Sequence, residues 1–445
     1  MSYSSRYGKR PQELASMSSH SNIINDSDVR EFLENCEYPK GKEEISINDT
    51  LIIDVNFPNS NHVKHIIAVD GGYSTVPVKK TFPSSLLTFF QFGTLLLSTN
   101  DLDHISEQPF ISREAMTKLK DLERDKLVLP TKNVAYNKSN SLVESVRQSI
   151  YRFFQRKDDG TTLLETLHWF LYEEYNQPID SYQLASCPHC HETRIDLYRT
   201  KFHPDFSQDC ENCGRSILIT DIFRFHEVVD NETGAGGILG YLTNLIEHFN
   251  LIHQIKNVRA SKPELLQSFM FIKDGPLAFF GQTAGLHKPM RRLCNFLFQT
   301  NNLFFAGLEK SGAFVEHADE IKDLIKPGQA LILDNKHIYQ NILPGDPDTP
   351  DPYGSTSYYS SKLIFKSRDE RMHVVTLPVD SESIVLNPQR KDFNNLDMIL
   401  WNIEKLRCDM YDNAIIPVAL ANKLISLSNH PSSVILEKFA TKTVK

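Results

Sequence analysis

The sequence has few cysteines, no long apolar run and no secretory leader. Seven cysteines among 445 residues are too few for a disulfide framework. No apolar stretch reaches the roughly 18 uninterrupted residues that a membrane-spanning helix needs. The N-terminal sequence MSYSSRYGKRPQ contains no apolar core of a signal peptide. These absences predict a soluble, cytoplasmic protein without a membrane segment.

The sequence also lacks an excess of positive charge. Lysine and arginine total 48 against 56 aspartates and glutamates, which gives a formal charge of −8. This balance argues against a protein that coats nucleic acid by charge alone. It does not exclude a nucleic-acid enzyme, because a metal-dependent site needs clustered carboxylates and its basic residues can be local. Hydrophobic residues make up 40% of the chain, which excludes wholesale disorder.

Apolar periodicity predicts a mixed α/β protein. Residues 1–30 contain eight serines and little apolar content, and we interpret them as a flexible arm. Two long β-branched or apolar runs predict a central hairpin, with Asp70 near the end of its first strand. Further strands are expected at 51–57, 224–230, 268–280, 302–312, 330–335, 362–368 and 372–379. Helices are expected at 111–130, 141–157, 161–175, 238–258 and 288–299, and over most of 394–440.

Four cysteines form two close pairs, Cys187-Pro-His-Cys190 and Cys210-Glu-Asn-Cys213, with 19 residues between them. Two residues between ligands let both thiolates face one tetrahedral ion, and two such knuckles close a four-sulfur shell. The pattern predicts a structural zinc ribbon over 184–220. An iron–sulfur site or four unrelated thiols are the alternatives. Two histidines are spare ligand candidates, and the other three cysteines have no partner spacing: His189, His191, Cys36, Cys294 and Cys408.

Two carboxylates share a pattern of apolar strand, aspartate and glycine. Asp70 lies in IIAVDGG and Asp274 in FMFIKDGPL. On neighbouring strands, such carboxylates could share magnesium or manganese ions, which prefer oxygen ligands. Two ions about 3.5–4 Å apart can activate water and stabilise the leaving oxygen of a phosphodiester. Asp-Gly is also a common turn, so an ordinary turn remains the alternative.

The order of these elements resembles the NurA family of DNA-end-processing nucleases. The resemblance spans most of the chain from about 60 to 428, with the cysteine module as an insertion. It rests on five segments: AVDGGYS (68–74), NLIEHFNLIHQI (244–255), FIKDGPL (271–277), FFAGLEKSG (304–312) and IIPVALANKLISLS (415–428). The resemblance implies an RNase H-like mixed sheet flanked by helices, with an inserted zinc ribbon and a helical C-terminal region.

The resemblance also implies roles for individual residues. Asp70 and Asp274 match the metal-binding aspartates, and Glu247 matches the helical glutamate. Together they would hold Mn²⁺ or Mg²⁺. Glu227 is the reserve candidate for the third acid, and a solvated glutamate is the plain alternative for Glu247. Lys310 could contact a phosphate or lie near the attacking water, or it could be a surface lysine.

The late part of the chain departs from the family pattern. The family places a tyrosine and a histidine in a proline-containing segment, which here reads AIIPVALANKL. Asn422 stands at the histidine position, and Tyr411 is the tyrosine nearest to Pro417. The departure puts these auxiliary residues in doubt, but not the carboxylates.

Two basic groups follow the second Asp-Gly pair. We expect them to contact phosphates, with two tyrosines stacking bases, unless they form only a solvated charged face. They are KPMRR (288–292) and the set Lys362, Lys366, Arg368 and Arg371, beside Tyr358 and Tyr359.

The sequence thus predicts a metal-dependent deoxyribonuclease. Its expected parts are the arm 1–30, a nuclease core in two stretches (31–183, with a helical insertion, and 221–445), and the ribbon 184–220 between them. The resemblance implies a homodimer that works on DNA with a HerA-type hexameric ATPase, in DNA repair or antiviral defence. One alternative is a non-catalytic zinc-ribbon subunit for nucleic-acid binding or assembly, and a weaker one is an RNase H-like enzyme acting on RNA.

Overall fold

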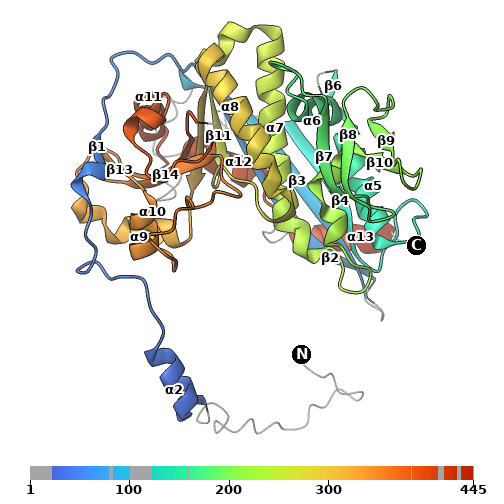
Figure 1. The fold of residues 1–445 in the computed structure, drawn as a ribbon, viewed down its shortest axis with the longest axis horizontal. Coiled ribbons are helices and arrows are strands. Elements are labelled where there is room, and N and C mark those ends of the chain that lie inside the picture. The colour runs from blue at the N-terminus through green and yellow to red at the C-terminus, as the bar shows by residue number, and fades with distance from the viewer. Residues whose placement is uncertain are drawn as a thin grey trace.

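The computed structural model describes residues 23–79, 84–100, 123–158, 160–381, 383–408, 415–427 and 432–443. A nine-stranded mixed sheet runs through the molecule, with helices on both faces (Figure 1). Its strand order is β1-β13-β14-β15-β12-β11-β2-β3-β4. The strands are β1 Ile52–Asp54, β2 His65–Lys79, β3 Ser85–Ser98, β4 Glu123–Lys132, β11 Phe269–Asp274, β12 Phe304–Glu309, β13 Gln329–Ile332, β14 Ser360–Lys366 and β15 Met372–Pro378.

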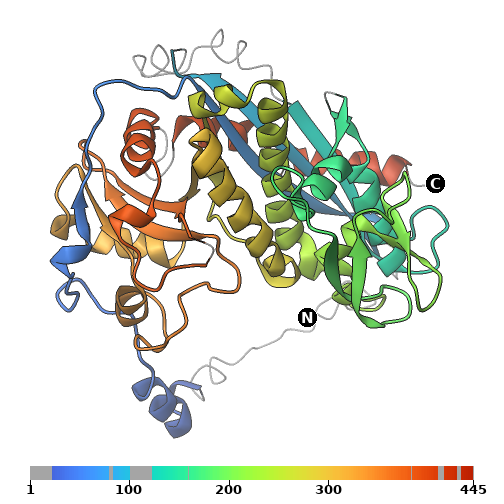
Figure 2. The same ribbon diagram turned by 45° about the horizontal axis from the view of Figure 1, so that its top comes forward.

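Ten α-helices are defined in the described residues. The helix α2 (Ser27–Glu34) has no buried residue and stands away from the body in both views (Figures 1 and 2). The others are α5 Leu142–Phe154, α6 Leu163–Leu171, α7 Leu239–Ser261, α8 His287–Asn301, α9 Ala313–Glu320, α10 Asn335–Asn341, α11 Leu396–Lys405, α12 Ile416–Ile425 and α13 Ser432–Thr443, after α2 Ser27–Glu34. None is long and apolar enough to cross a bilayer.

The central hairpin is confirmed, and its strands are long. β2 pairs antiparallel with β3 from His65 to Lys79, with Asp70 opposite Gly93. β11 runs parallel to β2 but pairs with it only as far as Lys273 opposite Val69. β2 therefore continues for ten residues after its pairing with β11 has ended. Asp70 lies at this point of divergence.

Side-chain alternation along β2 divides the core between the two faces of the sheet. Ile67 and Val69 pack in one cluster, with apolar residues of α5, α6, α7 and α8. Ile66 and Ala68 pack in the other, with α11 and α12. The helices α7 and α8 lie side by side across the sheet (Figures 1 and 2). The cysteine-rich segment lies on the opposite side of the molecule from β13–β15 (Figure 2).

Two sequence predictions need correction, and a third, the N-terminal arm, lies mostly outside the described residues. The helix expected over 111–130 is wrong where the structure describes it, because β4 is a strand in which buried Leu127 and Leu129 alternate with exposed Lys126 and Val128. Pro130 does not stop a helix but pairs with Leu87. Residues 101–122 lie outside the described part. The strand expected at 224–230 is a 3₁₀ turn, which Arg224 enters with a left-handed backbone (φ 60°). Residues 1–22 of the expected arm are not described, and its last four lie in α2.

Candidate metal and catalytic site

Asp70 is the buried acid at the centre of the candidate site. The residue is 4% exposed. Oδ1 accepts a hydrogen bond from the backbone N–H of Gly71 at 2.8 Å. Oδ2 is buried and has no hydrogen-bond partner among the described residues. A buried carboxylate oxygen without a donor is unfavourable, so Asp70 fits a ligand that would supply positive charge.

Gly71, the glycine after Asp70, allows α7 to pack closely against β2. A β-carbon at this position would lie 2.9 Å from Thr243 Cγ2 on α7 and 2.7 Å from the Phe92 ring. Only glycine therefore allows α7 to cross so close to β2. Glu247 follows Thr243 by one helical turn, so this contact brings the glutamate toward Asp70.

Glu247 is buried, so it is not the solvated glutamate of the plain alternative. It is 6% exposed, and its Oε2 lies 2.9 Å from Nζ of Lys273. The Lys273 side chain is 2% exposed and also donates to the carbonyl oxygen of Asp274 at 2.7 Å. Lys273 is absent from the residues predicted for the site, although a lysine inside an apolar strand is itself a signal of a buried partner.

Asp274 ends β11 and meets Lys310, which follows β12. Lys310 Nζ lies 2.6 Å from Asp274 Oδ2. Gly275 takes φ 83° and its N–H donates to the carbonyl oxygen of Leu308 at 2.6 Å, which ties the two strand ends together. Both partners of this ion pair are partly exposed, so the pair faces solvent. The structure thus brings together all four predicted residues, Asp70, Glu247, Asp274 and Lys310.

The electrostatics of the group follow from burial and crowding. The pKa of Asp70 is raised to about 7, first by burial and then by the charges of Asp274 and Glu247, while Lys310 opposes the rise. Burial also raises the pKa of Glu247, although Lys273 opposes it. The repulsion among the three carboxylates is therefore only partly offset by the positive charges of Lys273 and Lys310. A hard divalent cation, which prefers oxygen ligands, fits this donor set.

Glu227, the reserve candidate, lies elsewhere. It is paired with Arg224 at 2.6 Å and accepts a hydrogen bond from Ser186 at 3.1 Å. The acids that act on Asp70 are Asp274 and Glu247. Glu247 is the acid that the structure adds to the aspartate pair.

The four predicted cysteines form a second, separate group. Their sulfurs all lie within 4.8 Å of one another, which no other set of three or more such ligands achieves in the described part of the chain. The acids of Asp70, Glu247 and Asp274 are thus more widely spaced than the sulfurs. Cys187 and Cys213 are 4.0 Å apart, and Cys190 and Cys210 are 3.9 Å apart. This arrangement suits one tetrahedral ion.

The two knuckles share a backbone geometry that the sequence revealed only in part. Gly214 follows the second pair with φ 67°, and His191 follows the first pair with φ 62°. Each donates its N–H to the carbonyl oxygen of the first cysteine of its pair. His191 therefore occupies the place of a glycine. The strands around the cysteines are β7 Ser181–Ser186, β8 Thr193–Tyr198, β9 Ser207–Asp209 and β10 Ser216–Leu218.

The comparison structures are NurA nucleases. The crystal structure of the NurA nuclease from Sulfolobus solfataricus is 9% identical to this chain, with a TM-score of 0.32, and the match covers 98% of this chain and 97% of that one. Two further matches are a crystal structure of NurA (11% identity, TM-score 0.29) and one of NurA with manganese (12%, 0.24), each covering 97% of this chain and 98% of the other. No family model and no curated protein matches the sequence.

The basic surface expected beside this site is wrong for Lys362 and Lys366, the two lysines of β14. Lys362 is buried and ion-paired with Glu309, and Lys366 donates to the carbonyl oxygen of Lys322. Tyr358 and Tyr359 are buried as well. β14 and β15 are buried throughout their length, so their basic side chains satisfy internal partners. Among the remaining members, Lys288 is exposed, and the four arginines have partners within the protein: Arg291 the Tyr358 carbonyl oxygen, Arg292 Glu173, Arg368 Glu404 and Arg371 Asp369.

The late segment AIIPVALANKL forms α12 and its approach. Asn422, which the sequence resemblance places at a histidine position, is exposed. Tyr411 lies outside the described residues. The end of α12 nevertheless approaches the site, because a β-carbon on Gly72 would lie 3.8 Å from the Ile425 carbonyl oxygen.

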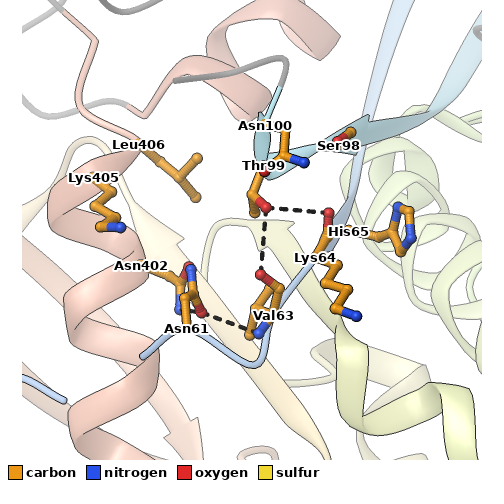
Figure 3. Close-up of a pocket in the computed structure, with 10 residues that line it drawn as sticks. All are labelled: Asn61, Val63, Lys64, His65, Ser98, Thr99, Asn100, Asn402, Lys405 and Leu406. Atoms are coloured by element: carbon orange, nitrogen blue, oxygen red, sulfur yellow. Dashed lines mark hydrogen bonds between the residues drawn. The ribbon is translucent and has the colours of Figure 1, made fainter. Parts of the chain in front are cut away.

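A pocket at the other end of β2 contains none of the four site residues (Figure 3). Asn61 and Asn402 bond to each other through their amides there. Figure 3 shows Lys64 and Lys405 on different sides of the pocket, so their charges do not converge on one ligand. The pocket therefore adds no group to the carboxylate site.

Proposed function

We propose that this protein is a divalent-metal-dependent nuclease that hydrolyses phosphodiester bonds in DNA. The observation that carries the proposal is the meeting of Asp70, Glu247 and Asp274 where β11 ends beside β2, with Asp70 Oδ2 buried and without a donor among the described residues. The proposal rests on these side chains.

The sheet supports an RNase H-like core. Strands β4, β3 and β2 are successive antiparallel neighbours, and β11 and β12 continue the sheet parallel to β2. The two aspartates lie on adjacent strands of this set, Asp70 on β2 and Asp274 on β11. The helix between β4 and β11 that carries the third acid is α7.

The side chains have distinct roles in this proposal. Asp70 and Asp274 hold Mn²⁺ or Mg²⁺ through carboxylate oxygens, and Glu247 completes the acidic group from α7. Divalent ions supply an activated water and stabilise the leaving oxygen when bound. Lys310 is partly exposed and can contact a phosphate oxygen of the substrate. Water is the nucleophile, so no covalent enzyme intermediate forms.

We also propose that the four cysteines bind a structural Zn²⁺, because their sulfur spacing suits a closed tetrahedral shell. The setting is proposed from the sequence resemblance alone: a cytoplasmic homodimer that processes DNA ends with a HerA-type ATPase, in DNA repair or antiviral defence.

The test is the release of nucleotides from end-labelled linear DNA with Mn²⁺ and a HerA-type partner. Wild type is compared with Asp274→Asn and with Glu227→Gln, a matched change in a carboxylate outside the site. We expect cleavage by wild type and Glu227→Gln, and loss in a folded Asp274→Asn. Equal cleavage by all three would contradict the proposed site. DNA binding without cleavage in any of them would favour a non-catalytic subunit.

A further inference from the structure

The candidate site contains a buried lysine, Lys273, whose ammonium is enclosed by the protein. Lys273 points inward from β11, and its side chain is 2% exposed. Its ammonium bridges Glu247 Oε2 at 2.9 Å and the Asp274 carbonyl oxygen at 2.7 Å. A β-carbon on Gly275 would lie 3.8 Å from Lys273 Nζ, so the ammonium reaches past Asp274 to the end of the strand.

The two lysines of the site differ in mobility. Lys310 pairs with Asp274 in a partly exposed position, so solvent can receive its ammonium when another cation takes the carboxylate. Lys273 has no such route, because removing its ammonium from Glu247 would leave two buried charges unpaired, which is strongly unfavourable. Glu247 therefore stays paired with Lys273 and is not available as a metal ligand.

The ligands that remain for a metal ion are on the two strands. Asp70 Oδ2 has no partner among the described residues, and Asp274 can exchange Lys310 for an ion. In a two-metal site the ions lie about 3.5–4 Å apart and share the surrounding carboxylates. Here the Lys273 ammonium already occupies the space beside Glu247 that a second ion would take. Once an ion replaces Lys310, the three carboxylates face only the ammonium of Lys273, and one divalent ion balances the two negative charges that are left.

We propose that Lys273 is a positioning residue that takes the place of one metal ion, so that the site binds a single divalent cation between Asp70 and Asp274. This inference rests on the proposed function and specifies how many divalent cations the same site binds. It makes Glu247 an acid that acts through Lys273 rather than a direct ligand.

The test is the stoichiometry and spectrum of bound Mn²⁺, measured by electron paramagnetic resonance, to which Zn²⁺ is silent. Wild type should bind one Mn²⁺ per chain with the spectrum of an isolated ion, and Asp70→Asn should lose it. Lys273→Met removes the charge but keeps most of the volume. It should bind a second Mn²⁺ through Glu247, with the broadened spectrum of a coupled pair. Lys310→Met is the matched control and should still bind one.

Two coupled ions in wild type that Asp70→Asn removes would overturn the inference, whether or not Lys273→Met folds. If Lys273→Met does not fold, Lys273→Arg keeps the charge and should bind one ion, and two ions in that variant would also overturn it. The outcomes separate the two proposals. Cleavage with two bound ions refutes only the single-ion inference, whereas no bound Mn²⁺ and no cleavage refute both.

Discussion

Gly71 lies directly against Thr243, and there is no room for a β-carbon between β2 and α7. Such a carbon would lie 2.9 Å from Thr243 Cγ2. This contact fixes how close Glu247, one turn further along α7, comes to Asp70. The packing of a helix on a strand and the spacing of the acids are therefore one feature of the fold.

The first prediction follows from this contact. Gly71→Ala should destabilise the protein by about 1–3 kcal/mol, as overpacking does, and should reduce cleavage by moving α7 away. Urea unfolding and the end-labelled assay measure the two effects. Gly240→Ala is the control, because a β-carbon there meets nothing within 4 Å and alanine favours the helix by up to about 1 kcal/mol. Equal stability of wild type and Gly71→Ala would show that α7 is not held this way.

The second prediction concerns pH and Asp70. Its folded pKa of about 7 lies above the ordinary value of 3.8, so the folded state binds more protons than the unfolded state between these values. Stability without metal is therefore full below about pH 4 and falls as pH rises through 7, by up to a few kcal/mol. Asp70→Asn should remove this fall and be more stable than wild type at pH 8.

The control for the second prediction is the ion itself. Mn²⁺ binds the ionised carboxylate, so it should restore the stability of wild type at pH 8 but not change that of Asp70→Asn. Chemical unfolding with chelator and with Mn²⁺ at pH 5 and 8 measures all four states. A wild-type stability that rises from pH 5 to 8 in chelator would contradict the buried, crowded position of Asp70.

The third prediction concerns the cysteines. Cys187 and Cys210 belong to the same apolar cluster as residues of α5, α6 and α7, so loss of an ion there should affect more than the ribbon. Cys190→Ser should abolish a stoichiometric Zn²⁺, measured by elemental analysis, and lower the unfolding temperature of the whole chain. Cys36→Ser, outside the group, should keep the zinc. Full zinc content in Cys190→Ser would exclude the four-sulfur shell.

The fourth prediction tests the buried pair of Lys362 and Glu309. Removing one partner leaves an unpaired buried charge, so Lys362→Ala should cost about 3–5 kcal/mol in unfolding measurements. The double change Lys362→Met with Glu309→Leu should recover much of this loss. DNA affinity of the folded double variant should equal that of wild type. A selective loss of DNA affinity without loss of stability would restore the phosphate-contact role that the burial excludes.

The sequence by itself determined the features that depend on local spacing. The C-x2-C pairs, the hairpin of β2 and β3, and the long helix α7 are visible because ligand spacing and apolar periodicity are short-range properties. The two Asp-Gly pairs were visible for the same reason, but only Asp274 ends its strand, whereas β2 continues from Asp70 to Lys79. The apolar alternation of Leu127 and Leu129 was hidden, because the charged helix-forming residues before them favoured a helix.

Only the tertiary structure decided which charges are buried and what they meet. Lys362 and Lys366 have the composition of a basic surface, but β14 and β15 lie inside the sheet and their ammonium groups are satisfied internally. In the sequence, Lys273 is one polar residue in an apolar strand. In the structure it pairs with Glu247 of α7, which lies 26 residues earlier in the chain. Such pairs depend on long-range packing of a helix against the sheet, which no local pattern encodes.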